Sequence, residues 1–235
     1  MDATDNTGKA TTPMQTTDRP FGPDAATILA TEHWSLLGTR SLIWNEAMSR
    51  TTVFLTVLSA SIVALALLAD ATGFGRRTTA VALVLLPVVF LLGLATYGRL
   101  VQINSEDVAI TLAMNRLRNA YLVMAPALRP YFSTGHHDDE RGVATTHLLG
   151  MGSHLQTWAH FLVTTPTIVA TVDAAVATAI VVLAGLAVEA PTAAVVAAGM
   201  VAFLAVWAAL FSLQRLNLRA LRQARSRFPT PPDEP

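Results

Sequence analysis

One acidic residue interrupts an otherwise apolar stretch of the chain, and it is the first candidate for chemistry. Asp173 lies within residues 166–188, which are otherwise uncharged. A charged side chain inside hydrocarbon costs about 3 kcal/mol even on lenient insertion scales, so such residues are rare and often functional. With a span starting at Pro166, Asp173 lies about 11 Å inside it. Two interpretations stay open: a structural carboxylate that snorkels or pairs with an arginine such as Arg99 or Arg50, or a cation or proton site.

A histidine-rich and acidic segment in the middle of the chain offers possible metal ligands. It begins His136-His137 and continues with two aspartates and a glutamate. His147 and His154 are seven residues apart, so they share one helix face. Zinc uses histidine and carboxylate ligands. The weak metal candidates are therefore His136, His137, His147 and His154, and a solvated polar loop is the competing interpretation because no established ligand spacing occurs.

A stripe of small and hydroxyl-bearing residues marks the first apolar stretch. Its members recur at helical spacing: Thr52, Thr56, Ser59, Val63, Ala66 and Asp70. Such a face could line a water-filled path, which makes Thr52, Thr56, Ser59 and Asp70 ion-path candidates together with Asp173. Small and hydroxyl residues also let membrane helices pack closely, so helix packing is the alternative interpretation.

A basic segment follows the last apolar stretch. It contains Arg215, Arg219, Arg222, Arg225 and Arg227. Anionic lipid headgroups attract such residues by about 1 kcal/mol each. We expect Arg215, Arg219 and Arg222 to bind lipid headgroups.

These candidates belong to a strongly apolar chain. Hydrophobic residues make up 52% of the sequence and charged residues only 14%, whereas soluble domains carry about 25% charged residues. The apolar residues gather in four stretches long enough to span a bilayer, 51–69, 78–98, 166–188 and 190–214. The predicted fold class is an all-α integral membrane protein, whose four transmembrane helices form two helical hairpins, 51–98 and 166–214.

The basic residues predict how the hairpins are oriented. Arg76 and Arg77 lie in the first hairpin loop, and every other lysine or arginine lies outside the hairpins. Because basic residues favour the cytoplasmic side, both termini and the middle segment should be cytoplasmic. The expected location is the cell inner (plasma) membrane. A single lysine among the 16 basic residues suggests a bacterial source.

Amphipathic cytoplasmic helices are expected before, between and after the hairpins. Residues 1–24 predict a disordered tail, 25–50 a helix that runs into the first span, 99–165 a helical segment, and 215–235 a basic helix and tail. Within the middle segment, apolar residues recur at alternating intervals of three and four positions in two runs, which we call seams. The seams predict two helices that pack together and hold a homo-oligomer. They are Ile110, Met114, Leu117, Tyr121 and Met124, and Leu148, Met151, Leu155, Trp158 and Leu162.

Two short motifs mark helix boundaries. Thr72-Gly73-Phe74-Gly75 is similar to a potassium-channel filter, but the filter pattern has one more residue between the threonine and the first glycine. The loop between the two spans is also too short for the pore helix that a filter requires. A tight helix–helix turn is predicted instead. Thr165 and Pro166 predict the N-cap and first residue of the third span.

The layout resembles that of the store-operated calcium channel family: four spans, cytoplasmic ends, Ser49-Arg50-Thr51 before the first span, and Asp173 in the third. That family places a glutamate inside the first span, whereas the acid here is Asp70 at its outer end. The resemblance therefore concerns architecture only.

The sequence excludes several function classes. It contains no cysteine, which rules out disulfides and thiol chemistry. It also has no Walker loop, G-x-S-x-G or dinucleotide motif, so we expect neither an enzyme nor a cofactor nor a nucleic-acid partner. The expected function is an oligomeric membrane protein that forms or gates a path for small ions. The alternative is a non-catalytic scaffold or accessory subunit of a larger membrane complex.

Overall fold

The computed structural model describes residues 21–147, 164–222 and 226–232, and within these ranges the chain is helical and contains no strand. The helices are α1 (Ala25–Thr72), α2 (Arg76–Met124), the 3-10 helix η1 (Pro126–Tyr131), α3 (Glu140–His147), α5 (Thr165–Ala187) and α6 (Thr192–Arg222). Four of the described helices, α1, α2, α5 and α6, are long and apolar enough to cross a membrane.

Helices α1 and α2 are much longer than a bilayer requires. They contain 48 and 49 residues, or roughly 70 Å each at about 1.5 Å per residue, against a hydrocarbon core of about 30 Å. Both continue without a break beyond their apolar stretches, as predicted for 25–50 and for the helix after the second span. Helix α2 ends at Met124, just before Pro126, as expected from the positions of the prolines.

The predicted tight turn joins α1 to α2. Helix α1 ends at Thr72, and Gly73 follows with a φ of 76°, a left-handed conformation that favours glycine. The Thr78 hydroxyl donates a 3.0 Å hydrogen bond to the Gly73 carbonyl and so fixes the turn from the other side. The motif is therefore a helix connection.

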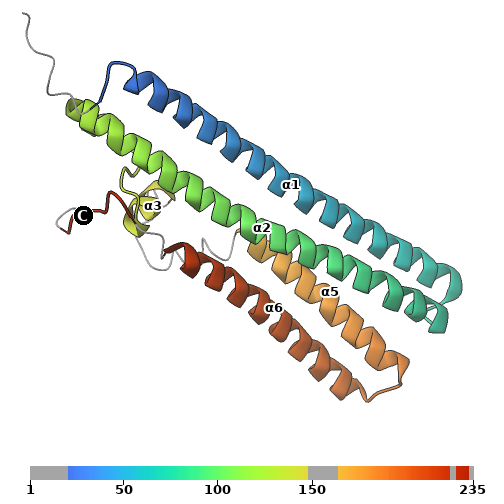
Figure 1. Ribbon diagram of the computed structural model, residues 1–235. Helices are drawn as coiled ribbons and strands as arrows, with labels where there is room; N and C mark the ends of the chain where they lie inside the picture. Colours follow the sequence, from blue (N-terminus) through green and yellow to red (C-terminus); the bar gives the residue numbers. More distant parts are fainter. Residues whose placement is uncertain (1–20, 148–163, 223–225, 233–235) are drawn as a thin grey trace, which may run out of the picture.

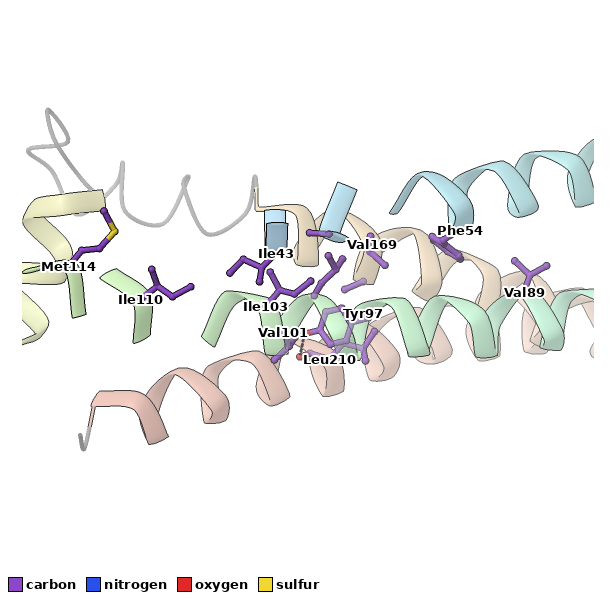
Figure 2. Close-up of a cluster of buried hydrophobic side chains, with 13 residues drawn as sticks. Ile43, Phe54, Val89, Tyr97, Val101, Ile103, Ile110, Met114, Val169 and Leu210 are labelled. Atoms are coloured by element: carbon purple, nitrogen blue, oxygen red, sulfur yellow. Dashed lines mark hydrogen bonds between the residues drawn. The ribbon is translucent and has the colours of Figure 1, made fainter. Parts of the chain in front are cut away.

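Helix α2 is the centre of the molecule. It packs against α1 on one side and against α5 on another, and α6 packs mainly against α5 (Figure 1). The largest core cluster follows α2 along its length, and Figure 2 shows Phe54, Val89, Tyr97 and Val169 within it. The Tyr97 hydroxyl donates a 2.5 Å hydrogen bond to the Leu210 carbonyl, which ties α6 to α2.

Large apolar side chains also cover the outside of the helices. Val53, Ile62 and Leu67 on α1 are each more than half exposed, as are Val84 on α2 and Met200 on α6. Exposed apolar patches of this extent mark contact with a membrane or with other proteins.

The start of α5 differs from the prediction by one residue. Helix α5 begins at Thr165, so Thr164 and not Thr165 is the N-cap residue, and Pro166 follows at the second helical position. The shift arises because Thr164 already has the extended backbone of an N-cap, with φ of −66° and ψ of 146°. Helix α6 passes through Arg215 and ends at Arg222, so the basic segment begins as the last part of this helix.

The predicted seam is only partly a packing surface. Ile110 and Met114 are buried in the core cluster, whereas Met124 is 36% exposed. The partner seam, residues 148–162, lies outside the described residues, as do residues 1–20.

Candidate functional site

Asp173 lies in the interior of the helix bundle. Its relative exposure is 0%, and its side chain faces a notch in α2 at Gly93. A Cβ atom built on Gly93 would lie 2.0 Å from Oδ1 of Asp173 and 3.0 Å from Cε2 of Phe54. Glycine is therefore required at position 93 for the carboxyl group to fit between α1, α2 and α5.

The carboxyl group has no hydrogen-bond partner among the described residues. Both of its oxygens are buried and unpaired. The two arginines that the sequence offered as partners bind another residue: Arg99 and Arg50 each lie 2.8 Å from a carboxylate oxygen of Glu46. The ion pair of Asp173 with Arg99 or Arg50 is therefore not formed in the described part of the chain.

The small-residue stripe of α1 lies apart from Asp173. Thr52, Thr56 and Ser59 are exposed and line a shallow surface groove, whereas Phe54, which contacts the Asp173 site, is fully buried. The Thr56 hydroxyl donates to the backbone carbonyl of Thr52 at 2.8 Å. The structure thus divides the ion-path candidates into an enclosed carboxyl group and an exposed face, with Asp70 exposed near the end of α1.

A polar network that the sequence reasoning missed joins the extensions of α1, α2 and α3. Asp107 is only 3% exposed. It accepts hydrogen bonds from Nε of Arg40 at 2.6 Å and from Nε1 of Trp44 at 3.1 Å. His147 Nε2 lies 3.7 Å from its second oxygen. Arg40 and Trp44 are four residues apart on one helix face, which was the available signal for a shared partner.

A second group of charges lies close to the ends of the apolar stretches. Glu46 binds both Arg99 and Arg50, and Arg99 also reaches Glu106 at 2.7 Å. The hydrogen bond from Arg99, followed by that from Arg50, lowers the pKa of Glu46 to about 2. Glu46 therefore stays ionised at neutral pH and links α1 to α2.

The acidic segment binds the C-terminal part of the chain. Asp138 accepts hydrogen bonds from the Ser226 hydroxyl at 2.5 Å, from the amides of Arg227 and Phe228 at 3.0 and 2.7 Å, and from Arg116 at 2.6 Å. Burial raises the pKa of Asp138, but these hydrogen bonds outweigh it and bring the pKa down to about 2. Asp138 is therefore an ionised anchor, and we call residues 226–230 the strap.

Asp139 extends this contact. It accepts hydrogen bonds from the amide and the hydroxyl of Thr230 at 2.7 and 2.9 Å, and from the amide of Gly142 at 2.8 Å. The interpretation of this segment as a solvated loop is thus wrong for Asp138, whose side chain is fully buried.

Three of the four metal candidates, His136, His137 and His147, lie in the described part of the chain. Among the described residues, no group of three or more histidine, aspartate or glutamate side chains could hold a metal ion. His147 contacts Thr111 at 3.2 Å, and the His136 and His137 rings lie 4.2 Å apart by their centroids. His154 lies outside the described residues.

The basic end of α6 is described only in part. Arg215 is exposed, and its guanidinium carbon lies 4.4 Å from the centroid of the Phe211 ring. The side chains of Arg219 and Arg222 lie outside the described part of the chain. Lipid binding by these arginines stays a prediction.

Comparison of the chain with protein-family models, with curated proteins and with solved structures gives no match. Its class therefore follows from its own structure. Four long apolar helices indicate a multi-pass membrane protein.

Proposed function

We propose that this chain is an oligomeric membrane protein that forms or gates a path for small ions, and that Asp173 binds the cation or exchanges the proton. The observation that supports this is the unpaired carboxyl group at the notch of Gly93. A buried carboxyl group without a partner costs stability. Its presence within an apolar helix is best explained by a role in transport.

The proposed topology places two helical hairpins in the inner (plasma) membrane. The first consists of the apolar parts of α1 and α2, the second of α5 and α6, and both ends of the chain are cytoplasmic. Arg50 and Arg99 meet at Glu46 near the cytoplasmic surface. The extensions of α1 and α2 beyond this level, with α3, then form a cytoplasmic region.

The exposed stripe of α1 supports the oligomer. Thr52, Thr56 and Ser59 face away from their own subunit, so a second subunit or a water-filled path between subunits would cover them. Because Asp173 has no exposed surface, an ion reaches it only when α5 separates from α1 and α2. This enclosed state corresponds to a closed path.

Ion flux into liposomes that contain only this chain tests the proposal. We expect Asp173→Asn to lower cation or proton flux by about tenfold or more. Removal of the charge should weaken the interaction of the site with the ion by more than about 1.4 kcal/mol, which corresponds to a factor of ten. Glu32→Gln, the same change at an exposed position of α1, should leave flux unchanged.

The outcomes separate the proposal from its alternative. Equal flux through the wild type and Asp173→Asn, at equal reconstitution and oligomer size, would contradict the role of Asp173. Absence of flux through the wild type, with a membrane partner that copurifies, would favour the accessory-subunit function.

A further inference from the structure

The loop that receives the strap is held in place by α2. The side-chain amide of Asn115 donates a 2.8 Å hydrogen bond to the His137 carbonyl, and Asn115 is itself fully buried. A Cβ atom on Gly142 would lie 1.9 Å from the same carbonyl oxygen, so the loop closes tightly against the start of α3. Asp138 is also fixed to α2 by Arg116. The two carboxylates thus form a preorganised receptor.

Polar contacts carry the docking of the strap. Besides the bonds that Asp138 and Asp139 accept, the Asp138 amide donates to the Phe228 carbonyl at 3.2 Å. Phe228 of the strap is 43% exposed. The docked position of the strap therefore depends on the hydrogen bonds that Asp138 and Asp139 accept.

Both strap hydroxyl groups are donors to an ionised carboxylate: Ser226 to Asp138, and Thr230 to Asp139. A negatively charged group on either hydroxyl oxygen would remove the hydrogen-bond donor. It would also place a negative charge in direct contact with the carboxylate of Asp138 or Asp139. Like charges at this distance repel, and the hydrogen bond is lost as well.

We propose that the strap is a releasable link between the end of α6 and the loop on α2, and that Ser226 and Thr230 are modification sites whose negative charge releases it. Phosphoryl transfer from a nucleoside triphosphate would supply this charge. The side-chain oxygen forms a bond to the γ-phosphorus, the bond from that phosphorus to the bridging oxygen breaks, and nucleoside diphosphate leaves. The hydroxyl proton passes to a base of the transferring enzyme.

Release of the strap changes how α6 is attached to α2. Upstream of the strap, Asn217 on α6 donates a 3.2 Å hydrogen bond to the Val101 carbonyl and also bonds the Ser105 hydroxyl. These contacts remain when the strap leaves. The part of α6 beyond Asn217 has a second attachment to α2, because the strap binds Asp138 and Arg116 of α2 binds Asp138. This second attachment is lost when the strap leaves.

Distance measurement between two spin labels in the full chain tests this proposal. The chain has no cysteine, so cysteines introduced at Leu128 and Pro231 take the labels uniquely, and both positions are exposed. In the wild-type background the labels should report one narrow, docked distance. Ser226→Glu and Thr230→Glu should shift the population to a broad, longer distribution.

Matched uncharged variants isolate the effect of charge. Ser226→Ala and Thr230→Val each remove one hydroxyl but leave the backbone hydrogen bonds in place. We expect each glutamate variant to lower the docking constant at least about tenfold below that of its matched variant. Equal docking of the glutamate and uncharged variants would overturn the proposal, as would a broad, undocked distribution in the wild-type background.

Discussion

Asp107→Asn is expected to destabilise the protein by about 1.5–3 kcal/mol, the largest effect we predict for a single charge. Loss of the carboxylate leaves the charge of the part-buried Arg40 side chain without its partner. Asp107 is 3% exposed, and the Arg40 side chain that it binds is only 27% exposed. The same change weakens the bond from Trp44 and the contact with His147. Unfolding of the reconstituted protein with denaturing detergent measures the loss.

The neighbouring acid is the matched control. Glu106 binds Arg99 through a side chain that is 43% exposed, and Arg99 keeps its bond to Glu46 when Glu106 is changed. Exposed pairs contribute about 0–1 kcal/mol, so Glu106→Gln should change stability by less than about 1 kcal/mol. Equal destabilisation by the two variants would mean that the Asp107 network does not hold α1 against α2.

The second large effect is expected in the membrane-spanning region. Gly93→Ala should destabilise the protein by about 1–3 kcal/mol, the usual cost of overpacking. The new Cβ atom would meet Asp173 Oδ1 at 2.0 Å and Cγ at 2.6 Å, and the short, enclosed aspartate side chain has little room to move away. The change in stability is measured by thermal unfolding, monitored as the loss of monodisperse protein.

Two further variants show whether the clash with Asp173 is the cause. Gly98 lies on the same helix, and a Cβ atom added there would meet no neighbouring atom within 4 Å, so Gly98→Ala should be neutral or slightly stabilising. In the double variant Gly93→Ala, Asp173→Ala the carboxyl group is gone, and much of the lost stability should return. A double variant no more stable than Gly93→Ala would contradict the predicted fit of Asp173 into the notch.

Local patterns predicted the helices well. Apolar runs of about 20 residues specify spanning helices through hydropathy alone, and the positions of Gly73 and Pro126 specify where α1 and α2 end. The sequence also singled out Asp173, because a carboxyl group within an apolar run is a local anomaly.

Contacts between distant residues could not be read in the same way. Asp107 lies 67 positions from Arg40 and 63 from Trp44, and their meeting depends on the register of α1 against α2, which no local pattern gives. For the same reason the sequence suggests Arg99 as a partner of Asp173, whereas the register of α1 against α2 brings Arg99 to Glu46. The notch at Gly93 was missed because a single glycine in an apolar helix is usually only a packing residue.

The acidic segment illustrates a different limit. Two aspartates beside two histidines suggest a metal site by composition, but most of the hydrogen bonds that these aspartates accept come from backbone amides and hydroxyls 88 to 91 positions away. Backbone amides leave no signature in the sequence. The partners of this loop are therefore known only from the position of the strap in the folded chain.

Infrared difference spectroscopy of the reconstituted protein tests the role of Asp173 most directly. The carboxyl band of Asp173 is identified by its absence in Asp173→Asn. If Asp173 binds cations or exchanges protons with solution, this band should change reversibly when the cation or the pH of the bathing solution is changed. A band that stays constant under all these conditions, in a protein that nevertheless conducts ions, would contradict the proposed ion site.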